Sequence, residues 1–564
     1  MAFSITSETL IHVETPFKVH AGPGAGKTYW LAKHINNVVN NSKRLGVTRK
    51  VACISYTNVG ADTIYDRLHN CISCVEISTI HSFLYSYIVK PFLPLFSKEF
   101  GVDTSKMKVI PNEGFMTRGY IRPILENLGY AWIHSDSVIT GLQKCRWEYS
   151  NGEFINYRPT YTIPAYNTKG RKTKYFVSQK IYETFLHHQW GEGYLSYDDI
   201  IYFAIKLTQR CPHIFNFLIA KFPYFFIDEF QDSIPPIIDL VKEMAHYGCI
   251  VGVVGDKAQT IYDFIGASPK LFDDFTVANI QEYEIHGNRR SSPQIIDLLN
   301  VIRPDFIQVA IEGIPNLLPM LIIGEKLDAY EYALSVCKGC EIQSLAFPNI
   351  VANAMKYNIN GTKSDEKLID SDFDSDPHRS LYIKSLFKAV EYAYHNNLSD
   401  AWRYLKCIED DRTVALDYLK KLLSGRSTYV NGSLFDFYEY VVTNLGIPLK
   451  RMKNGAAIKE FYLTHKYVEL ALGVAVGDSI SPHKTIHKAK GDEFKNVLVI
   501  MDSKDLDLFV TPMLETKSSH RVYYVGLSRA RERLFINVDN VPSRTLNQLE
   551  KLPIEIVNLG HIEG

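Results

Sequence analysis

The sequence predicts an α/β protein built on parallel β-sheets. Short, continuous apolar runs recur along the chain and alternate with segments of helical periodicity, a pattern typical of strands buried on both faces of a parallel sheet. Polar, chemically reactive side chains directly follow several runs, and ligands of such sheets bind at the carboxyl ends of the strands. The runs cover residues 17–20, 50–55, 224–227, 249–254, 497–501 and 534–538.

Length and composition predict a soluble, cytoplasmic protein. The 564 residues are 46% hydrophobic and 22% charged, as in globular rather than disordered chains. The 62 basic and 62 acidic side chains balance, which is compatible with a local basic patch. Nine irregularly spaced cysteines favour a reducing compartment. We find no secretory signal and no apolar run of about 18–20 residues, so we expect no membrane span.

The first apolar run leads into a phosphate-binding loop, residues 21–28, AGPGAGKT. It matches G-x-x-x-x-G-K-[S/T], with alanine in place of the first glycine. Gly22, Gly24 and Gly26 allow the backbone amides to face a polyphosphate at a helix N-terminus. Lys27 would reach the β- and γ-phosphates, and the Thr28 hydroxyl would ligate Mg²⁺. The loop predicts binding of a nucleoside triphosphate; a glycine-rich turn with a surface lysine is the alternative.

A pair of carboxylates follows the run at 224–227. Asp228 is suited to hold Mg²⁺, and Glu229 is suited to orient and deprotonate an attacking water. The pair therefore favours hydrolysis over transfer of phosphate to a substrate hydroxyl, which argues against a small-molecule kinase.

Further segments follow a fixed order along the chain: CISYTNVGADTIYDRL at 53–68, STIHSF at 78–83, VGDKAQTIYDFIGA at 254–267, NRRS at 288–291, TIHKAKGDEF at 485–494 and VYYVGLSRA at 522–530. With the phosphate loop and the acidic pair, this set resembles the superfamily 1A DNA helicases of the UvrD/Rep/PcrA type.

The resemblance implies two RecA-like α/β motor domains with parallel sheets, each carrying a helical insertion. Motor domain 1A is expected at residues 1–89 and 195–273, with insertion 1B at 90–194. Motor domain 2A is expected at 274–398 and 479–564, with a reduced 2B-like insertion at 399–478.

The resemblance also implies roles at the nucleotide. Gln259 would sense the γ-phosphate, and Arg290 and Arg529 would be arginine fingers from the opposite motor domain. Gly491 and Glu493 would lie near the sugar and phosphates. ATP and Mg²⁺ are the expected cofactors.

Three positions depart from the family pattern. Arg289 stands where a tyrosine usually stacks on adenine, although a guanidinium can also stack. No glutamine precedes Lys27 to read the base. Ile265 replaces an arginine that commonly helps to couple DNA to ATP. The departures concern the base end of the pocket and the coupling to DNA, and they leave the triphosphate end complete.

A second set of side chains is expected on single-stranded DNA, where base stacking on an aromatic ring contributes about 1–3 kcal/mol. The set is Tyr56, Thr57, Asn58, Thr79, His81, Tyr262, Phe264 and His487.

The predicted function is an ATP-dependent 3′–5′ translocase and helicase acting on single-stranded and forked DNA. The alternative is a DNA-responsive ATPase switch with little unwinding that regulates a separate nuclease. Compact relatives include the helicase subunit of the Gabija anti-phage system, which acts beside an OLD-family nuclease, and the chain resembles that type in length.

Overall fold

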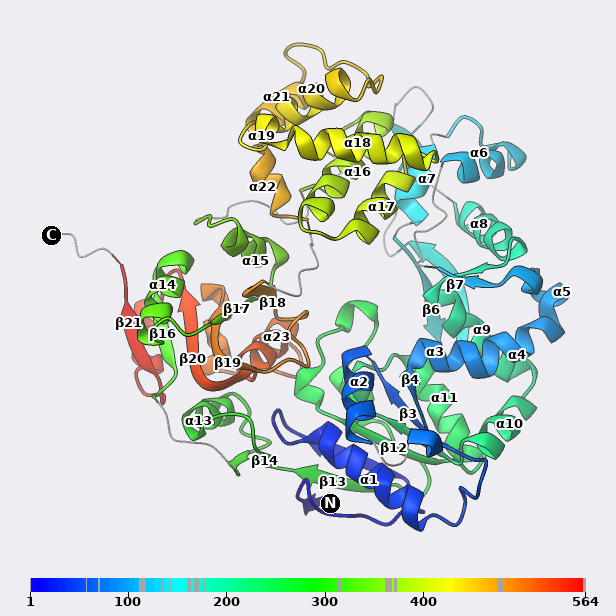
Figure 1. The fold of residues 1–564 in the computed structure, drawn as a ribbon, viewed down its shortest axis with the longest axis vertical. Helices are drawn as coiled ribbons and strands as arrows, with labels where there is room; N and C mark the ends of the chain where they lie inside the picture. Colours follow the sequence, from blue (N-terminus) through cyan, green and yellow to red (C-terminus); the bar gives the residue numbers. More distant parts are fainter. Residues whose placement is uncertain are drawn as a thin grey trace.

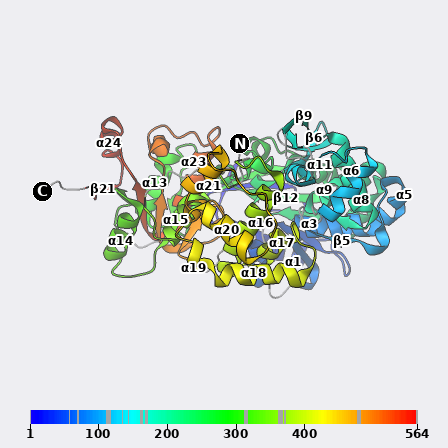
Figure 2. The same ribbon diagram turned by 90° about the horizontal axis from the view of Figure 1, so that it is seen from above.

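The computed structural model describes residues 2–56, 58–68, 72–110, 118–133, 135–142, 144–159, 164–166, 172–176, 178–311, 317–360, 368–369, 373–474 and 481–560. Two α/β units lie side by side, a helical unit lies above them, and an insertion rich in helices extends from the first α/β unit (Figure 1). Seen from above, the second α/β unit and this insertion lie at opposite ends of the molecule (Figure 2). None of the described helices combines the length and apolarity that crossing a bilayer requires.

The first α/β unit contains a seven-stranded sheet whose neighbouring strands all pair in parallel. Its strand order is β1 (Phe3–Ile5), β13 (Gln281–Ile285), β2 (Phe17–Ala21), β12 (Ile250–Gly255), β11 (Tyr224–Ile227), β3 (Val51–Ser55) and β4 (Val75–Thr79). The parallel strands predicted from the apolar runs are confirmed here. Because β13 pairs with both β1 and β2, this unit extends beyond the predicted boundary at residue 273.

Helices pack on both faces of this sheet. They are α1 (Lys27–Asn41), α2 (Asn58–Arg67), α3 (Ile80–Leu84), α9 (Tyr197–Arg210), α10 (His213–Lys221), α11 (Pro235–His246) and α12 (Pro269–Asp273). Tyr197–Arg210 begins at a capping box in which the side chains of Ser196 and Asp199 each bond to the other's backbone amide.

The first insertion contains strands in addition to the predicted helices. Its elements are α4 (Lys90–Phe92), α5 (Ser97–Phe100), β5 (Lys108–Val109), α6 (Arg118–Asn127), α7 (Ser135–Leu142), β6 (Cys145–Ser150), β7 (Glu153–Pro159), β8 (Pro164–Tyr166), β9 (Lys172–Phe176), α8 (Gln179–Gly191) and β10 (Tyr194–Leu195). The strands β6 and β7 form an antiparallel hairpin, as do β8 and β9. The ring of Trp147 from this hairpin stacks on Tyr202 of α9, with ring centroids 3.9 Å apart, so the hairpin is fastened to the first α/β unit.

The second α/β unit contains a six-stranded parallel sheet of order β18 (His483–Thr485), β17 (Gln343–Ala346), β19 (Phe494–Ile500), β20 (Ala530–Val538), β16 (Met320–Ile323) and β21 (Glu555–Asn558). Around it lie α13 (Pro293–Ile302), α14 (Lys326–Val336), α15 (Asn349–Lys356), α23 (Ser518–Leu527) and α24 (Ser543–Leu549). A short parallel pair, β14 (Gly287–Asn288) and β15 (Val309–Ala310), lies where the chain passes from the first unit to the second.

The helical unit begins earlier than the predicted residue 399. It consists of α16 (Pro377–Tyr394), α17 (Leu398–Lys406), α18 (Arg412–Ser424), α19 (Arg426–Tyr429), α20 (Leu434–Asn444), α21 (Ala457–Thr464) and α22 (Tyr467–Ala471). The apolar side of α16, including Ile383, Phe387 and Val390, lies in the same core as the later helices. The amphipathic pattern of α16 is visible in the sequence, but the partner that covers its apolar face is a tertiary property.

A buried carboxylate joins the helical unit to the second α/β unit. Glu391 of α16 is inaccessible to solvent, and its oxygens accept hydrogen bonds from the hydroxyls of Tyr357 and Tyr467, both at 2.6 Å. Arg426 donates to the same carboxylate at 3.1 Å. Tyr357 follows α15, whose Asn353 side chain donates to two backbone carbonyls just after α22. These bonds hold the helical unit against α15.

His34 gives the first α/β unit a defined sensitivity to acid. It is buried on α1 and stacked on Trp30 with centroids 5.3 Å apart, and its ring nitrogens have no hydrogen-bond partner among the described residues. Burial lowers the pKa of His34 to about 4. Because the unfolded chain binds this proton more readily, His34 stabilises the fold fully above its unfolded pKa, and this stability is lost as the pH falls from about 6.5 towards 4.

We therefore predict that this histidine alone lowers the free energy of unfolding by about 2 kcal/mol between pH 7 and pH 5. In a His34→Leu variant, the thermal unfolding temperature should fall less over this interval than in the parent. His213→Leu changes an exposed histidine and is the matched control. An equal fall of the unfolding temperature between pH 7 and pH 5 in the parent and in His34→Leu would contradict the prediction.

Candidate nucleotide site and DNA-binding surface

A cavity of about 670 Å³ lies between the two α/β units. It forms where loops after β2, β11 and β12 of the first unit face residues 487–493 and 529 of the second. Of the predicted nucleotide residues, those that line it are Gly24, Gly26, Lys27, Thr28, Asp228, Glu229, Gln259, Arg289, Arg290, Gly491, Glu493 and Arg529. Gly22 does not line the cavity.

The phosphate loop has the backbone that its glycines allow. Gly24 and Gly26 have φ values of 70° and 78°, in the left-handed region that favours glycine. The unusual Ala21 is the last residue of β2, so a residue with a side chain is tolerated there. A side chain at Gly22 would collide with the amide end of Gln308. Gln308 would then have to give up the hydrogen bond that its Nε2 donates to the carbonyl of Pro23.

Lys27 is buried at the start of α1, and its ammonium group donates to the carbonyls of Ala21 and Gly22 at 3.4 and 3.5 Å. Both bonds are long, so the ammonium can exchange them for phosphate oxygens without leaving the loop.

The Thr28 hydroxyl and the Asp228 carboxylate lie together. Thr28 Oγ1 donates to Asp228 Oδ2 at 2.8 Å. Burial, followed by the charge of Glu229, raises the pKa of Asp228 to about 6. A hydroxyl and a carboxylate in contact are the oxygen ligands that Mg²⁺ prefers beside a phosphate, and a divalent cation would relieve the cost of burying this carboxylate. The residues present therefore fit Mg²⁺.

Glu229 has a strained backbone and an ionised side chain. Its φ of 54° lies in the left-handed region, where a residue other than glycine is uncommon and often functional. Burial acts to raise the pKa of Glu229, but the charges of Lys27 and Lys490 outweigh it and the pKa is lowered. Gln231 Nε2 donates to its carboxylate. Glu229 is thus held as a carboxylate able to accept a proton.

Gln259 connects the two units. Its Nε2 donates to Asp256 Oδ2 at 2.7 Å, and its Oε1 accepts from Arg529 Nη2 at 3.1 Å. Arg529 is 2% exposed, and burial together with the charge of Arg290 lowers its pKa. Two guanidinium groups close together in a buried wall favour an anionic ligand.

Arg290 lies on the same wall. It donates to the carbonyl of Ser528 at 3.0 Å and to Glu493 Oε1 at 2.7 Å, and within the part of the chain that the structure describes its buried Nε has no partner. Burial acts to raise the pKa of Glu493, but the charge of Arg290 prevails and the pKa is lowered. The unsatisfied Nε leaves Arg290 with hydrogen-bonding capacity for a further acceptor.

At the other end of the cavity, Arg289 lies among side chains that the sequence did not single out. Its Nε donates to Ser7 Oγ at 3.3 Å, and the guanidinium lies 3.9 Å from Glu8. Tyr29 is 42% exposed, and the guanidinium of Arg67 lies 6.0 Å from its ring. Glu8, Tyr29 and Arg67 line the cavity. The position of Tyr29 directly after Thr28 of the phosphate loop was the sequence feature that could have identified it as a residue of the site.

Lys490 and Asp232 form a buried ion pair between the units that the sequence also did not indicate. Lys490 Nζ donates to Asp232 Oδ2 at 2.6 Å and to the carbonyl of Gln259 at 2.9 Å. Burial raises the pKa of Asp232 to about 6, although the charge of Lys490 acts in the opposite direction. Lys490 lies inside the motif at 485–494 and Asp232 follows Glu229 by three residues, but their pairing cannot be deduced from spacing.

Three predicted DNA-binding residues meet at the junction of the units. The rings of Tyr262 and Phe264 lie 5.9 Å apart, and the ring of His487 from the second unit lies 6.3 Å from Phe264. Phe264 is 75% exposed, so one face of this group is available for stacking.

The remaining predicted DNA contacts lie elsewhere. Tyr56 packs partly against the core of the first unit, lines the nucleotide cavity and donates its hydroxyl to Ser233 at 2.6 Å, so it is not a free stacking surface. Thr79 caps α3 by accepting from the amide of Ser82. His81 is partly buried, with its ring 5.4 Å from that of Tyr197. Thr57 and the side chain of Asn58 lie outside the described residues.

One further cluster has the donors of a metal site. Asp505, Asp507 and His520 lie close together. The ammonium of Lys517 is 2.9 Å from both carboxylates, and His520 Nδ1 accepts from the amide of Met513. His520 Nε2 therefore carries the proton, and lysine supplies the positive charge that a metal would provide.

The chain matches two family models. The UvrD/REP helicase N-terminal domain matches residues 4–278, and the UvrD-like helicase C-terminal domain matches residues 480–540.

Individual relatives are distant. The Gabija protein GajB of Bacillus cereus is 24% identical over 330 residues, which cover 51% of this chain and 47% of that protein. The ATP-dependent DNA helicase Rep of Salmonella typhimurium is 26% identical over 302 residues, covering 51% and 41%. The DNA helicase II of Rickettsia typhi is 22% identical over 652 residues, covering 96% and 94%. The first two matches thus span less than half the length of those relatives.

Tyr29 provides a test of the base end of the cavity. We predict that Tyr29→Ala weakens binding of a nucleoside triphosphate by about 1 kcal/mol, about 5-fold, because a stacking surface is lost. Binding of inorganic tripolyphosphate, which has no base, should not change. Titration with a fluorescent nucleotide measures the effect. Tyr65→Ala removes an exposed ring of α2 outside the cavity and is the control; a loss of the same size there would refute the assignment.

Proposed function

This chain belongs to the UvrD/REP helicase family, and we propose that it hydrolyses ATP to move along single-stranded DNA and to unwind duplex. One observation carries the proposal: Lys27, Asp228 and Glu229 of one α/β unit share a cavity with Arg290 and Arg529 of the other. Neither unit alone holds this set.

In the proposed reaction, the amides of the phosphate loop and Lys27 bind the β- and γ-phosphates. Glu229, held as a carboxylate, accepts a proton from the attacking water. Thr28 and Asp228 would hold a Mg²⁺ ion, which would supply positive charge beside the phosphates. Gln259 contributes its carboxamide beside the γ-phosphate.

Arg290 and Arg529 stabilise the charge that spreads over the transferring phosphoryl group, an effect on the order of 10³–10⁵ in rate. Because they come from the second unit, the triphosphate draws the two units together and its hydrolysis releases them. Hydrolysis and the opening and closing of the two units are thereby coupled.

The aromatic group of Tyr262, Phe264 and His487 supports a DNA grip at the same junction. Since Phe264 and His487 belong to different units, a change in the cavity alters their separation. Stacking tolerates any base sequence, as a translocase requires. The 3′–5′ direction is part of the proposal and rests on family resemblance.

The second candidate function is a DNA-responsive ATPase switch that regulates a partner nuclease of the OLD-family kind, in an anti-phage role. The similarity to the Gabija protein GajB favours it. Ile265, where the family commonly has an arginine, lies exposed beside Phe264, which is consistent with altered coupling between DNA and ATP.

Lys27→Ala tests the ATPase. We predict that this variant loses ATP turnover by at least about 100-fold, since a positioned charge on the transferring phosphate is removed, while its unfolding temperature stays within about 2 °C of the parent. Lys43→Ala removes an exposed lysine just after α1 and should retain the parent rate. Parent-like turnover by Lys27→Ala would overturn the site assignment.

A forked duplex with a 3′ single-stranded tail separates the two candidate functions. The motor predicts strand displacement that requires ATP and Mg²⁺ and disappears in Lys27→Ala. ATP turnover stimulated by single-stranded DNA without displacement would exclude the motor and favour the switch.

A further inference from the structure

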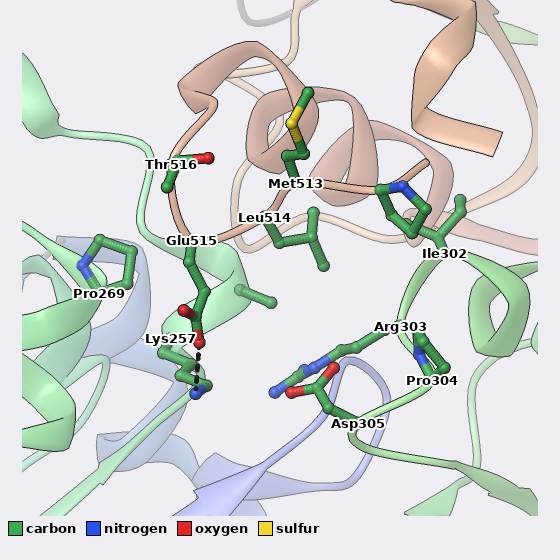
Figure 3. Close-up of a pocket in the computed structure, with 12 residues that line it drawn as sticks. Lys257, Pro269, Ile302, Arg303, Pro304, Asp305, Met513, Leu514, Glu515 and Thr516 are labelled. Atoms are coloured by element: carbon green, nitrogen blue, oxygen red, sulfur yellow. Dashed lines mark hydrogen bonds and ion pairs between the residues drawn. The ribbon is translucent and has the colours of Figure 1, made fainter. Parts of the chain in front are cut away.

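The two α/β units also meet at a second cavity. A smaller cavity of about 380 Å³ lies there, with Lys257 and Pro269 of the first unit on one side and residues 302–305 and 512–516 of the second on the other. Figure 3 shows the Lys257–Glu515 ion pair across one side of this cavity and the side chain of Arg303 on another.

Arg303 enters this contact from the second unit. It follows α13, whose Leu298, Leu299 and Ile302 lie in the core of that unit. The side chain is 1% exposed and lies over the ring of Phe306, 4.5 Å from its centre. Its direction is therefore set by packing in the second unit.

The guanidinium reaches into the first unit. Arg303 Nη1 donates to Asp256 Oδ1 at 2.7 Å, and Nη2 lies 2.6 Å from His20 Nε2. His20 directly precedes Ala21, at the base of the phosphate loop. Asp256 follows β12 and is inaccessible to solvent.

Asp256 is ionised because of this contact. Burial acts to raise the pKa of Asp256, but the charge of Arg303, with His20 close by, holds it well below its usual range. A buried carboxylate without such a partner would be costly.

The same carboxylate orients Gln259. Oδ1 accepts from Arg303 and from the amide of Ala258 at 3.1 Å, whereas Oδ2 accepts from Gln259 Nε2 at 2.7 Å. With its amide nitrogen engaged by an anion, Gln259 presents its oxygen to Arg529 Nη2. The Asp256 amide also donates to Gln231, which in turn bonds Glu229.

We propose that Arg303 is a positioning residue for ATP hydrolysis: through Asp256 it sets the orientation of Gln259 and hence the place of Arg529. The inference rests on the ATPase function proposed above. It assigns the second unit two connections to the hydrolytic site, one through the arginines that face the phosphates and one through Arg303.

The ion pair at the edge of this cavity has a different character. Lys257 lies 3.3 Å from Glu515, whose side chain is 75% exposed. Exposed pairs contribute little. Within the described part of the chain, the Lys257 ammonium bonds Asp273 and Glu515 and neither Gln259 nor Asp256. The pair therefore joins the same two units without touching the hydrolytic network, which makes Lys257 the matched control.

The test compares Arg303→Met, Arg303→Lys and Lys257→Met with the parent chain. ATP turnover gives kcat and KM, a fluorescent ADP analogue gives nucleotide affinity, and thermal unfolding reports on folding. We expect Arg303→Met to lower kcat at least about 10-fold, since small misplacement of catalytic groups has effects of this size or larger. KM and ADP affinity should stay within about 3-fold, because no phosphate contact is lost.

Arg303→Lys should recover part of kcat, since an ammonium can still pair with Asp256 but not also with His20, and Lys257→Met should behave as the parent. Parent-like kcat in Arg303→Met would overturn the inference, and so would an equal loss in Lys257→Met. If Arg303→Met fails to fold, Arg303→Lys decides the question. A lowered kcat with an unchanged KM supports the inference. A kcat equal to that of the parent overturns it, and so does a lowered kcat accompanied by an equal loss of nucleotide affinity. A parent that does not hydrolyse ATP would overturn the proposed function itself.

Discussion

The structure depends on charge buried where two parallel sheets face one another. The first unit supplies carboxylates at the ends of β11 and β12, and the second supplies the guanidinium of Arg529 and the ammonium of Lys490. Buried charges are costly unless they are paired and hydrogen-bonded. Lys490 with Asp232, and Arg303 with Asp256, meet this condition only when the units are in contact. The contact between units is therefore a condition for burying these charges as well as a feature of the fold.

This constraint explains the unusual local features around the cavity. Glu229 keeps a left-handed backbone although it is not a glycine, and its carboxylate stays ionised because cations surround it. Asp228, a neighbour in the chain, has a raised pKa because burial prevails there. Two adjacent carboxylates thus acquire opposite properties from their surroundings, which is how a site separates a ligand for a cation from an acceptor of protons.

The helical unit is attached to the second α/β unit by buried polar contacts of the same type. Glu391 accepts from Tyr357 at the end of α15, and Asn353 of α15 bonds backbone carbonyls after α22. On its other side, α16 contacts α7 of the first insertion. The helical unit is therefore fastened to one α/β unit by buried hydrogen bonds and also contacts the insertion of the other.

The sequence by itself determined the α/β class, the strands β2, β3, β11, β12, β19 and β20, and most of the residues predicted to line the cavity between the units. These features are local: an apolar run of four to six residues specifies a buried strand, and the glycines of the phosphate loop specify its backbone. Tertiary structure decided the rest. The helical unit begins at α16 rather than at residue 399. The sequence missed this boundary because the periodicity of an amphipathic helix does not specify which element covers its apolar face. Tyr56 lines the nucleotide cavity, and Arg303 bonds Asp256. Sequence alone could not predict these contacts, because they join residues that are distant in the chain and form only after both sheets have packed together.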